Sequence, residues 1–402
     1  MTDLHNKAFP TRAVHAGERT PQGNARPVTT SIVPSVSYTY ESMDDLDAVF
    51  ANAQPGFIYS RYTSPTVAAF ESAVADLEEG GAALAFASGM AAIQAALLAA
   101  GVQAGTSVVS LFDVYGATYS LLTRFFAGMG VSTRMVDGND LAAVEAALKE
   151  SKPVALLVET ISNPLLKVAD IPALAGLAHA YGARLLVDNT FATPCLFRPL
   201  THGADYVIHS ATKYLAGHGD VLAGIVVTSA TNRARMYETN KLLGSNLGPF
   251  EAWLAFRGLK TLPLRVRQQC SNAALLAGWL AERPEIAHVN YPGLVSHPQH
   301  ALAQRLFDGQ GMGGVLSFEI KNAARADVFR FMEALQLCLP ATSLGDIYTL
   351  VLHPATSSHR SLTAAERERA GIREGLLRLS AGIEEPQDIQ ADLEQALKVL
   401  KK

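Results

Sequence analysis

An acid and a lysine, Asp188 and Lys213, each follow a short apolar run in the middle of the chain. The runs 185–187 and 206–208 have the length and composition of buried parallel strands. Open α/β sheets bind ligands at the carboxyl ends of their strands, so both side chains are expected at one ligand-binding edge. A desolvated lysine amine can bond covalently to a carbonyl group, and a carboxylate can hold a protonated ring nitrogen. The pair therefore predicts a site for a carbonyl cofactor that contains a pyridine ring.

A strand, a glycine turn and a helix start in the N-terminal half can bind a phosphate group. The apolar run 82–87 is followed by Ser88, Gly89 and Met90, and the helix-forming run 91–100 comes next. Main-chain N–H groups at a helix N-terminus point outward and carry a partial positive charge. The amides of Gly89 and Met90, together with the Ser88 hydroxyl, are therefore a candidate phosphate seat.

Three more side chains suit a phosphate. Ser210 and Thr212 place hydroxyl groups beside Lys213, and the Arg61 guanidinium can clamp a phosphate through two hydrogen bonds. Taken singly, each feature has an ordinary structural explanation, since a strand-terminal Asp often caps a helix, a lysine is usually solvated and a glycine turn can simply be tight. Taken together, they match the aldehyde, the ring nitrogen and the phosphate of pyridoxal 5′-phosphate, which we predict as the cofactor.

Regular strand and helix patterns between about residues 64 and 230 must position these groups. Apolar runs typical of strands alternate there with amphipathic runs typical of helices. This alternation predicts an α/β fold with a mostly parallel central sheet and helices on both faces. The strand runs are 107–111, 131–137, 154–160 and 183–190, the helix runs are 140–150 and 171–182, and a further helix begins at Thr118.

The pattern changes at both ends of this region. The first 60 residues contain several prolines and little periodicity, which indicates an extended arm rather than an independent domain. After residue 262 the pattern becomes that of a smaller α+β unit, with strands at 313–320 and 376–383 and helices at 327–335 and 386–400. We expect an arm over 1–63 that contacts a partner subunit, a large pyridoxal phosphate-binding domain over 64–262 and a small C-terminal domain over 263–402.

Ten short motifs, in order along nearly the whole chain, resemble the Cys/Met-metabolism (transsulfuration) family of pyridoxal phosphate enzymes. This family includes methionine γ-lyase, cystathionine γ-synthase and γ-lyase, and the O-acylhomoserine sulfhydrylases. The resemblance implies the fold type I, or aspartate-aminotransferase-like, architecture. The motifs are YSRYTSPT (59–66), SGM (88–90), VYGATY (114–119), ETISNPL (159–165), VDNTFATP (187–194), HSATKYLAGHGD (209–220), RGLKTLPLR (257–265), SLGD (343–346), HPATSSH (353–359) and RLSAGIEE (378–385).

The resemblance implies a role for each matching residue. Lys213 is implied to bind the cofactor covalently and to move protons, and Tyr115 to stack on the cofactor and to help protonate the departing group. The implied cofactor contacts are Ser88, Gly89, Met90, Asp188, Thr190, Ser210, Thr212 and Lys213, joined by Tyr59 and Arg61 from a neighbouring subunit. The implied substrate contacts are Asn163 and Arg378 at the carboxylate, with Ser343, Tyr348, Ile58 and Ser120. Shared sites imply at least a dimer, commonly a homotetramer of two such dimers.

Three uncharged residues bear on the substrate. In family members that handle cystathionine, charged side chains recognise the distal amino-acid head at the positions that match Ile58, Ser120 and Tyr348. Leaving a buried ammonium without a partner costs on the order of a few kcal/mol, so a short, uncharged substrate tail is favoured. The first interpretation is a methionine γ-lyase-like γ-elimination that releases a thiol, 2-oxobutanoate and ammonia.

Several alternatives remain open. Typical methionine γ-lyases carry a cysteine where this chain has Ala117, so γ-replacement by an O-acetylhomoserine or O-succinylhomoserine sulfhydrylase ranks second. Cystathionine γ-lyase or γ-synthase activity ranks third. Two hypotheses from other classes are a catalytically silent binding protein with this fold and an aminotransferase. The retained Lys213 and the lack of an added basic helical domain argue against a silent regulator.

The composition limits the partners and the location. The 402 residues include 33 Lys and Arg and 37 Asp and Glu, a net charge of −4 with no basic run, so nucleic acid and membrane are not expected partners. The N-terminus does not resemble a signal peptide, and a cytoplasmic location is expected. Cys195, Cys270 and Cys338 are widely spaced, which suggests reduced structural thiols and no metal site.

Overall fold

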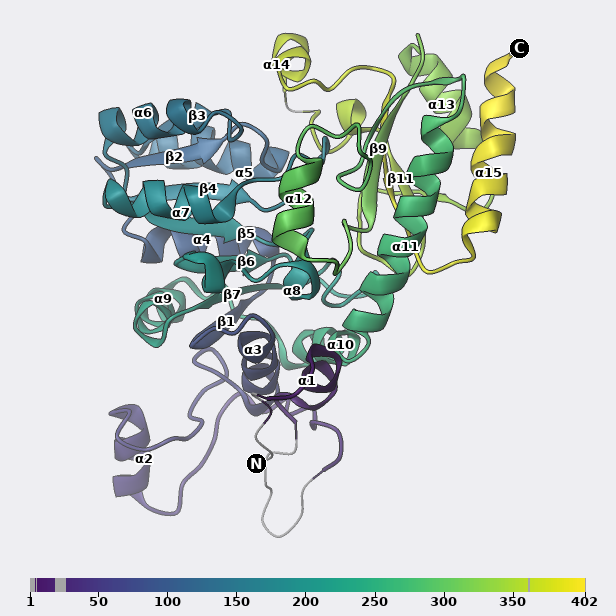
Figure 1. Cartoon of the computed structure of the whole chain (residues 1–402). Helices are drawn as coiled ribbons and strands as arrows, with labels where there is room; N and C mark the ends of the chain where they lie inside the picture. Colours follow the sequence, from purple (N-terminus) through teal and green to yellow (C-terminus); the bar gives the residue numbers. More distant parts are fainter. Residues whose placement is uncertain (1–3, 5, 19–26, 361, 402) are drawn as a thin grey trace.

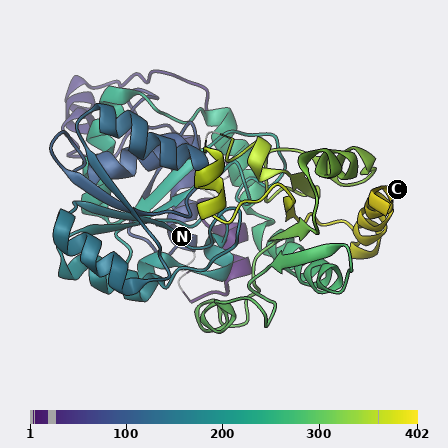
Figure 2. The same cartoon turned by 90° about the horizontal axis from the view of Figure 1, so that it is seen from above.

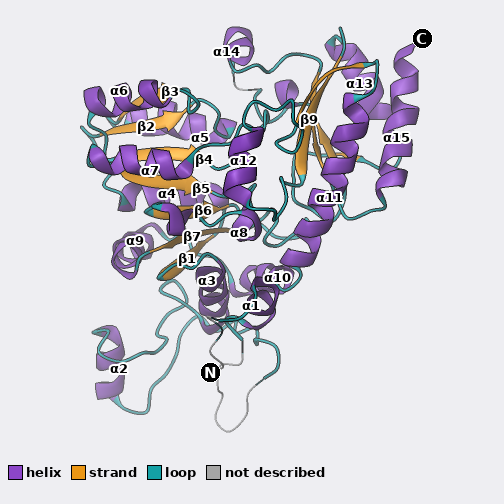
Figure 3. Ribbon diagram, viewed as in Figure 1, coloured by secondary structure: helices purple, strands orange, loops and turns teal. Residues whose placement is uncertain are grey.

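The computed structural model describes residues 4, 6–18, 27–360 and 362–401, and it contains two β-sheets, each packed against helices (Figure 1). Viewed from above, the smaller C-terminal unit, coloured green to yellow, lies beside the larger one (Figure 2). The strands of each sheet are enclosed by helices (Figure 3). The boundary expected at residues 262 and 263 stays a prediction.

The large sheet has seven strands in the order β1-β7-β6-β5-β4-β2-β3. Only β7 runs antiparallel to its neighbours, which are β1 and β6. The remaining pairs are parallel, which confirms the mostly parallel sheet. The strands are β1 (Ala82–Phe86), β2 (Ser107–Leu111), β3 (Ser132–Val136), β4 (Ala155–Glu159), β5 (Arg184–Asp188), β6 (Tyr206–His209) and β7 (Gly224–Thr228).

Helices cover both faces of the large sheet because successive strand residues point to opposite faces and both sets are apolar. Val109 packs into the core on one face, whereas Val108 packs into the core on the other. The first face is covered by α3 (Pro65–Leu77), α6 (Leu141–Ser151), α7 (Ile171–Ala180), α8 (Thr193–Leu196) and α10 (Pro249–Leu259). The second is covered by α4 (Gly89–Ala99), α5 (Gly116–Ser120) with the π-helix Leu121–Phe126, and α9 (Ala230–Leu243).

The small sheet has five strands in the order β10-β11-β12-β9-β8. Leu377 and Leu379 on its strand β12 pack into a separate core with helices α11, α13 and α15, so Arg378 and Ser380 point to the opposite face. The strands are β8 (Ile286–Asn290), β9 (Val315–Ile320), β10 (Leu339–Pro340), β11 (Leu350–Leu352) and β12 (Leu376–Ser380). The helices are α11 (Leu262–Ala281), α12 (His300–Phe307), α13 (Arg325–Ala334), α14 (Ala364–Arg369) and α15 (Pro386–Lys398).

The N-terminal region is more structured than the expected extended arm. It contains two short helices, α1 (Phe9–His15) and α2 (Met43–Phe50). The buried Arg12 of α1 pairs with Asp76 at 2.9 Å and with Glu79 at 3.0 Å, which ties α1 to the end of α3. Parts of the arm, 1–3, 5 and 19–26, lie outside the described residues.

Candidate active site

The carboxyl ends of β1, β4, β5 and β6 meet at one edge of the large sheet, because these strands run in the same direction. Glu159 ends β4 and lies opposite Asp188, which ends β5. Asp188 in turn lies opposite Ile208 of β6, and the turn that carries Lys213 begins just after this strand. The sheet therefore brings the predicted acid and lysine to one place, as expected for a ligand site in this class of fold.

Asp188 is held by a short chain of hydrogen bonds. Its Oδ1 accepts the Thr190 hydroxyl at 2.5 Å and the Thr190 main-chain N–H at 3.0 Å. The Thr190 hydroxyl oxygen also accepts the Ser210 N–H at 2.8 Å, which links the ends of β5 and β6. Burial raises the pKa of Asp188, whereas the Thr190 hydrogen bonds and nearby His209 lower it. A cationic ring nitrogen next to Asp188 would favour the charged carboxylate.

The predicted phosphate seat lies at the N-terminus of α4. Ser88 is the residue that caps this helix, and its Oγ accepts the Ala91 N–H at 3.1 Å, so its hydroxyl hydrogen remains able to donate. Gly89 lies so close to Ser210 that a side-chain Cβ there would be 2.8 Å from the Ser210 Cβ. Gly224 lies against the Ser88 carbonyl in the same way. Glycines thus let the two segments that are predicted to bind phosphate approach each other.

Thr212 and Lys213 lie in the turn after β6. The Thr212 hydroxyl bonds to the main chain of Ala223, accepting its N–H at 2.9 Å and donating to its carbonyl at 3.2 Å. The Lys213 amine donates to Ser343 Oγ at 3.1 Å. Burial, followed by the charge of Arg378, lowers the pKa of Lys213, and Asp346 opposes this shift. A larger share of the amine is therefore neutral near physiological pH, as a nucleophile or base requires.

Arg378 brings a buried positive charge to the same place from the small sheet. It is 2% exposed and donates to Asn163 Oδ1 at 3.0 Å and to the Ser343 carbonyl at 2.8 Å. Its Nε has no hydrogen-bond partner among the residues that the structure describes. A buried donor without a partner is costly, so this atom is suited to a ligand carboxylate. Burial lowers the Arg378 pKa to about 10, which leaves the guanidinium charged.

Glu159 orients two of the predicted substrate-side residues. Its Oε1 accepts the Tyr115 N–H at 2.6 Å, and the main chain of Asn163 also bonds to it. Burial, followed by the charge of Asp188, raises the pKa of Glu159 well above its usual range. The Tyr115 side chain itself is 42% exposed. The Glu159 carboxylate is therefore satisfied by backbone amides and, through them, orients the segments of Tyr115 and Asn163.

Four predicted residues have other surroundings. Arg61 bonds to the Lys241 carbonyl and lies over the rings of Tyr59 and Tyr62, outside the group around Lys213. Ile58 bonds through its carbonyl to Tyr38 in the same N-terminal segment. Ser120 and Tyr348 are partly open to solvent. Ser120 is half-buried on α5, and Tyr348 is 49% exposed in the loop after Ser343. This chain alone therefore does not gather Ile58, Tyr59 or Arg61 with the cofactor residues.

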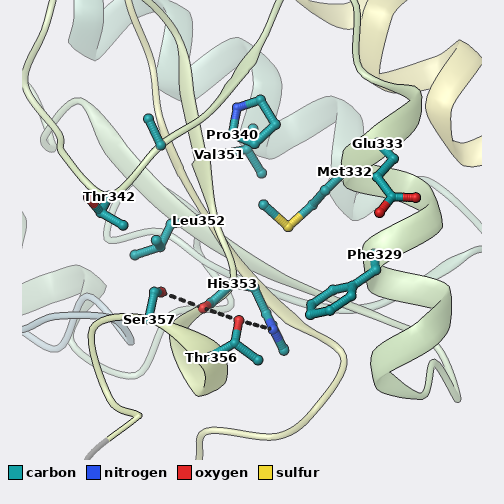
Figure 4. Close-up of a pocket in the computed structure, with 11 residues that line it drawn as sticks. Phe329, Met332, Glu333, Pro340, Thr342, Val351, Leu352, His353, Thr356 and Ser357 are labelled. Atoms are coloured by element: carbon teal, nitrogen blue, oxygen red, sulfur yellow. Dashed lines mark hydrogen bonds between the residues drawn. The ribbon is translucent and has the colours of Figure 1, made fainter.

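Two cavities adjoin this region. One of about 410 Å³ lies between the domains and is lined in part by Asn163, Tyr119, Lys167 and His359. The other, of about 230 Å³, lies between α13 and β11 and contains none of the predicted residues (Figure 4). Its His353 has both ring nitrogens satisfied, Nδ1 by Thr356 Oγ1 and Nε2 by the Glu374 carbonyl. The first histidine of the HPATSSH motif is therefore structural.

Membrane-spanning helices, metal-binding groups and reactive thiols are further features that would define the class of the protein. Within the described ranges, no helix is both long and apolar enough to cross a membrane, and no group of three or more His, Cys, Asp or Glu side chains is arranged to hold a metal. Burial raises the pKa of Cys195 and of Cys270 to about 12, so neither is a reactive thiolate near neutral pH.

The residues present fit pyridoxal phosphate. Asp188 suits the ring nitrogen, Lys213 suits the aldehyde, and the start of α4 with Ser210 suits the phosphate, in a cradle where a Cβ on Gly89 would collide. The fold and this site define a pyridoxal phosphate-dependent enzyme.

The comparison with family models agrees. Residues 10–398 match the model described as Cys/Met metabolism PLP-dependent enzyme, and the chain belongs to this family. The resemblance, the cofactor and the enzyme class predicted from the sequence are thereby confirmed, and the family's members include carbon–sulfur lyases and γ-replacing enzymes.

Relatives with different activities match the chain about equally well. An O-succinylhomoserine sulfhydrylase of Pseudomonas aeruginosa is 42% identical over 400 residues, which cover 99% of this chain and 97% of the relative. An L-methionine γ-lyase of Pseudomonas putida is 43% identical over 392 residues, 97% of each chain. A crystal structure of cystathionine γ-synthase from Xanthomonas oryzae pv. oryzae, in complex with aminoacrylate and cysteine, has a TM-score of 0.92 at 35% identity and 98% coverage of both chains.

His359 adds a pH dependence that the sequence did not reveal, although it ends the quoted HPATSSH motif. It is 3% exposed, its Nδ1 pairs with Ser358 Oγ at 2.9 Å, and burial and Arg378 lower its pKa to about 4. The unfolded chain, with a His pKa near 6.5, binds more protons between about pH 6.5 and 4, so the free energy of unfolding should fall as the pH falls through this window. The His359 share is on the order of 3 kcal/mol.

We expect His359→Gln to reduce this loss of stability between pH 6.5 and 4.5, measured by urea unfolding at fixed protein concentration. His297, with a pKa also lowered to about 4, should retain part of it. The exposed His202 offers a control, since His202→Gln should keep the full slope. An unchanged slope in His359→Gln would show that its ring is not held neutral.

Proposed function

We propose that this protein catalyses pyridoxal phosphate-dependent γ-elimination on a short sulfur amino acid, in the manner of a methionine γ-lyase. The observation that carries the proposal is the meeting of Lys213, Ser343, Arg378 and Asn163 at the sheet edge beside Asp188. These groups supply an amine that can move protons, a cationic seat for an α-carboxylate and an anion for a ring nitrogen. An amino acid is the substrate class that uses all three.

Proton movement falls to Lys213 and Tyr115. Bound pyridoxal phosphate supplies a ring that accepts the electron pair left at the substrate Cα. The lowered pKa of Lys213 makes its amine a base for the Cα proton, and the same amine can return a proton farther along the substrate. Asp188 holds the ring nitrogen in its protonated form, which strengthens the ring as an electron acceptor. Tyr115, held through its N–H by Glu159, is assigned the proton that accompanies the leaving thiol.

Substrate selection is assigned to two ends of the site. Arg378 and Asn163 bind the α-carboxylate, with the free Arg378 Nε available for one carboxylate oxygen. Ile58, Ser120 and Tyr348 are proposed to face the substrate tail. All three are uncharged, so a second ammonium or carboxylate at the end of the tail would be desolvated without a partner. This favours methionine or homocysteine over cystathionine.

γ-Replacement by an acylhomoserine sulfhydrylase is the second candidate. The 42% identity to an O-succinylhomoserine sulfhydrylase nearly equals the 43% identity to a methionine γ-lyase. Ala117 supports this candidate, because it replaces the cysteine that is expected at this position in the lyases. The two reactions use the same carboxylate seat and the same lysine, and they differ in whether a thiol or sulfide captures the substrate after its γ substituent leaves.

We also propose a homotetramer built of dimers with shared sites, in which the arm over 1–63 contacts the partner. Large apolar side chains on the arm and on α9 support an assembly, since Met43 is 73% and Leu242 is 87% exposed. Arg61 bonds to the carbonyl of Lys241 on α9 and lies over the Tyr59 ring, and each of the two is proposed to complete the phosphate site of a second copy of the chain. The expected cytoplasmic location stays a prediction.

Removal of the lysine amine tests the proposed chemistry. Lys213→Ala should lose the visible absorbance of the covalently bound cofactor and lower kcat by at least about 10⁴-fold, because both the covalent attachment and the base are removed. Lys149→Ala removes an exposed lysine on α6 and should behave like the wild type. Turnover retained in Lys213→Ala would exclude the mechanism, and a wild-type protein that binds the cofactor without any turnover would favour the silent binding protein.

A substrate panel separates the candidate reactions. We expect wild-type protein loaded with pyridoxal phosphate to release 2-oxobutanoate from methionine faster than from cystathionine, without added sulfide. O-acetylhomoserine and O-succinylhomoserine, each with and without sulfide, complete the panel. Homocysteine formed only with an acylhomoserine and sulfide would make the protein a sulfhydrylase. A preference for cystathionine would contradict the roles given to Ile58, Ser120 and Tyr348, and amine transfer that depends on a keto acid would indicate an aminotransferase.

Subunit mixing tests the shared site. Arg61→Ala should weaken cofactor retention and activity, and Lys213→Ala should be inactive. If Arg61 acts on a partner's cofactor, co-expressed hybrids of these two variants contain one site with both wild-type residues, and they should regain activity far above either variant alone. A hybrid no more active than Arg61→Ala would place both residues in the site of one chain and exclude sharing.

A further inference from the structure

Three buried polar side chains lie along one face of α11. Arg265, Gln269 and Asn272 are four and then three residues apart, a spacing that places them on the same side of a helix. They are 4%, 0% and 0% exposed. Buried polar groups are costly unless they are hydrogen-bonded, so their partners indicate why the helix carries them.

Each of the three side chains donates to backbone carbonyls of a different segment near the active site. Arg265 donates to the carbonyl of Tyr214 at 2.8 Å, in the turn that carries Lys213, and to the carbonyl of Gly258 at 2.7 Å, near the end of α10. No side chain fits at Gly217 in that turn, because a Cβ there would lie 2.0 Å from the Arg265 guanidinium. Arg265 is the last residue of the RGLKTLPLR motif, for which the sequence indicated no role. Its guanidinium holds the lysine turn by hydrogen bonds.

The other two members bind the small-domain segments. Gln269 Nε2 donates to the Asp346 carbonyl at 2.7 Å, in the loop that begins with Ser343. Asn272 Nδ2 donates to the carbonyls of Gly382 at 3.1 Å and Glu384 at 2.7 Å, just beyond the strand that carries Arg378. Side chains of one helix therefore form hydrogen bonds with three motif segments, HSATKYLAGHGD, SLGD and RLSAGIEE.

The helix that carries this row belongs to both cores. Leu262 and Val266 pack in the core of the large sheet, whereas Leu276 and Leu280 pack in the core of the small sheet. Figure 1 shows α11 running from α10 up along the small sheet beside α15. The spacing between the lysine turn and the Ser343 loop is therefore set by positions along one rigid helix, rather than by the loops themselves.

The two loops also touch each other directly. The Ile347 N–H donates to the Gly217 carbonyl at 3.0 Å. Gly345, at φ +70, lies so close to Tyr214 that a Cβ would be 2.7 Å from its main-chain nitrogen. The Gly345 N–H donates to Ser380 Oγ at 2.8 Å, next to Arg378 on β12. These contacts fix the distance between the Ser343 loop and the lysine turn while Gln269 holds the Asp346 carbonyl.

We propose that Arg265, Gln269 and Asn272 are positioning residues that set the geometry of Lys213, Ser343 and Arg378, and that Gln269 is the member that holds the Ser343 loop against Lys213. The proposal rests on the proposed active site. None of the three touches the substrate or the reacting atoms. They act by fixing backbone carbonyls, which keeps the half-buried Lys213 amine 3.1 Å from the Ser343 hydroxyl and within reach of the charge of Arg378.

Replacing Gln269 tests this inference. Gln269→Met keeps a similar length and removes the donor, and Gln269→Asn keeps the amide but is one methylene too short to reach the carbonyl. With the Ser343 loop released, water reaches Lys213 and its pKa rises, since burial is the largest cause of its lowering. Neither variant replaces Arg378 or Asp346, the two charged groups that act on the Lys213 amine.

The readouts are cofactor capture and turnover. Apo protein is mixed with pyridoxal phosphate, and the rate of covalent capture by Lys213 is followed by absorbance across pH. Only the neutral amine reacts, so the pH of half-maximal rate should rise by about one unit in both variants. The kcat/KM for the best substrate of the wild type should fall about 10- to 100-fold, the loss expected from misplacing a reacting group by about 1 Å.

Cys270→Ala is the matched control, because Cys270 is the next residue on α11, is 6% exposed, and its thiol bonds to the main chain of Met312 and Gly313 rather than to the lysine turn or the Ser343 loop. It should lower the unfolding temperature while leaving the capture profile and kcat/KM unchanged. Wild-type capture profiles in both Gln269 variants, or an equal shift in Cys270→Ala, would overturn the inference. Failure of the proposed site itself would look different, because the wild-type apo protein would then capture no cofactor at Lys213.

Discussion

The direction of four strands is the constraint on which the site depends. Because β1, β4, β5 and β6 run in parallel, a helix N-terminus, two carboxyl groups and the lysine turn emerge at one edge of the large sheet. Antiparallel strands would send alternate ends to opposite edges and separate these groups. β7 is the one antiparallel strand of this sheet, and its start at Gly224 serves the site through the close approach to Ser88 that its glycine allows.

A buried guanidinium joins the small domain to this edge. Arg378 is fully desolvated, and in the described part of the chain its hydrogen-bond partners are an amide and a carbonyl rather than a carboxylate. A buried charge with neutral partners stays available to an anion, and the cost of burying it is offset when a carboxylate arrives. The same charge lowers the pKa of Lys213. Arg378 thus acts on both proposed functions, the binding of a substrate carboxylate and the lowering of the pKa of the proposed base.

Much of the fold followed from local pattern, and the errors have local causes. The runs 185–187 and 206–208 correspond to β5 and β6 because continuous apolar runs are typical of strands buried on both faces. The helix expected from residue 91 begins at Gly89, since Ser88 caps it. The strand expected over 376–383 ends earlier, at Ser380. Beyond this residue the chain turns so that Gly382 lies against the Ile347 carbonyl. α1 and α2 were missed because they are short and lie among prolines.

Site residues that follow a local sequence pattern could be predicted, whereas those that depend on distant contacts could not. Asp188 and Lys213 could be found because Asp188 directly follows an apolar run and Lys213 lies in the short turn after another, so sequence alone indicates their edge of the sheet. The role of Glu159 did not follow from its place at the start of the ETISNPL motif, since nothing local shows that its carboxylate receives the Tyr115 N–H. Gln269 was not found at all, because a glutamine in a helix is usually solvated and its partner, the Asp346 carbonyl, is distant in sequence. Contacts between side chains and distant backbone carbonyls leave no periodic signal in the sequence.

Relatives with different reactions match this chain almost equally well, and the site explains why. Elimination and replacement would both use the proposed carboxylate seat, the Lys213 amine and an acid that pairs with the ring nitrogen, and all of these residues lie on the shared scaffold. The reactions diverge only at the tail of the substrate, where Ser120 and Tyr348 of this chain and Ile58 of a second copy are proposed to lie. On this proposal, selectivity between the two reactions depends on a few exposed or half-buried side chains. The overall sequence identity to a relative therefore reflects the shared scaffold and does not indicate which reaction is catalysed.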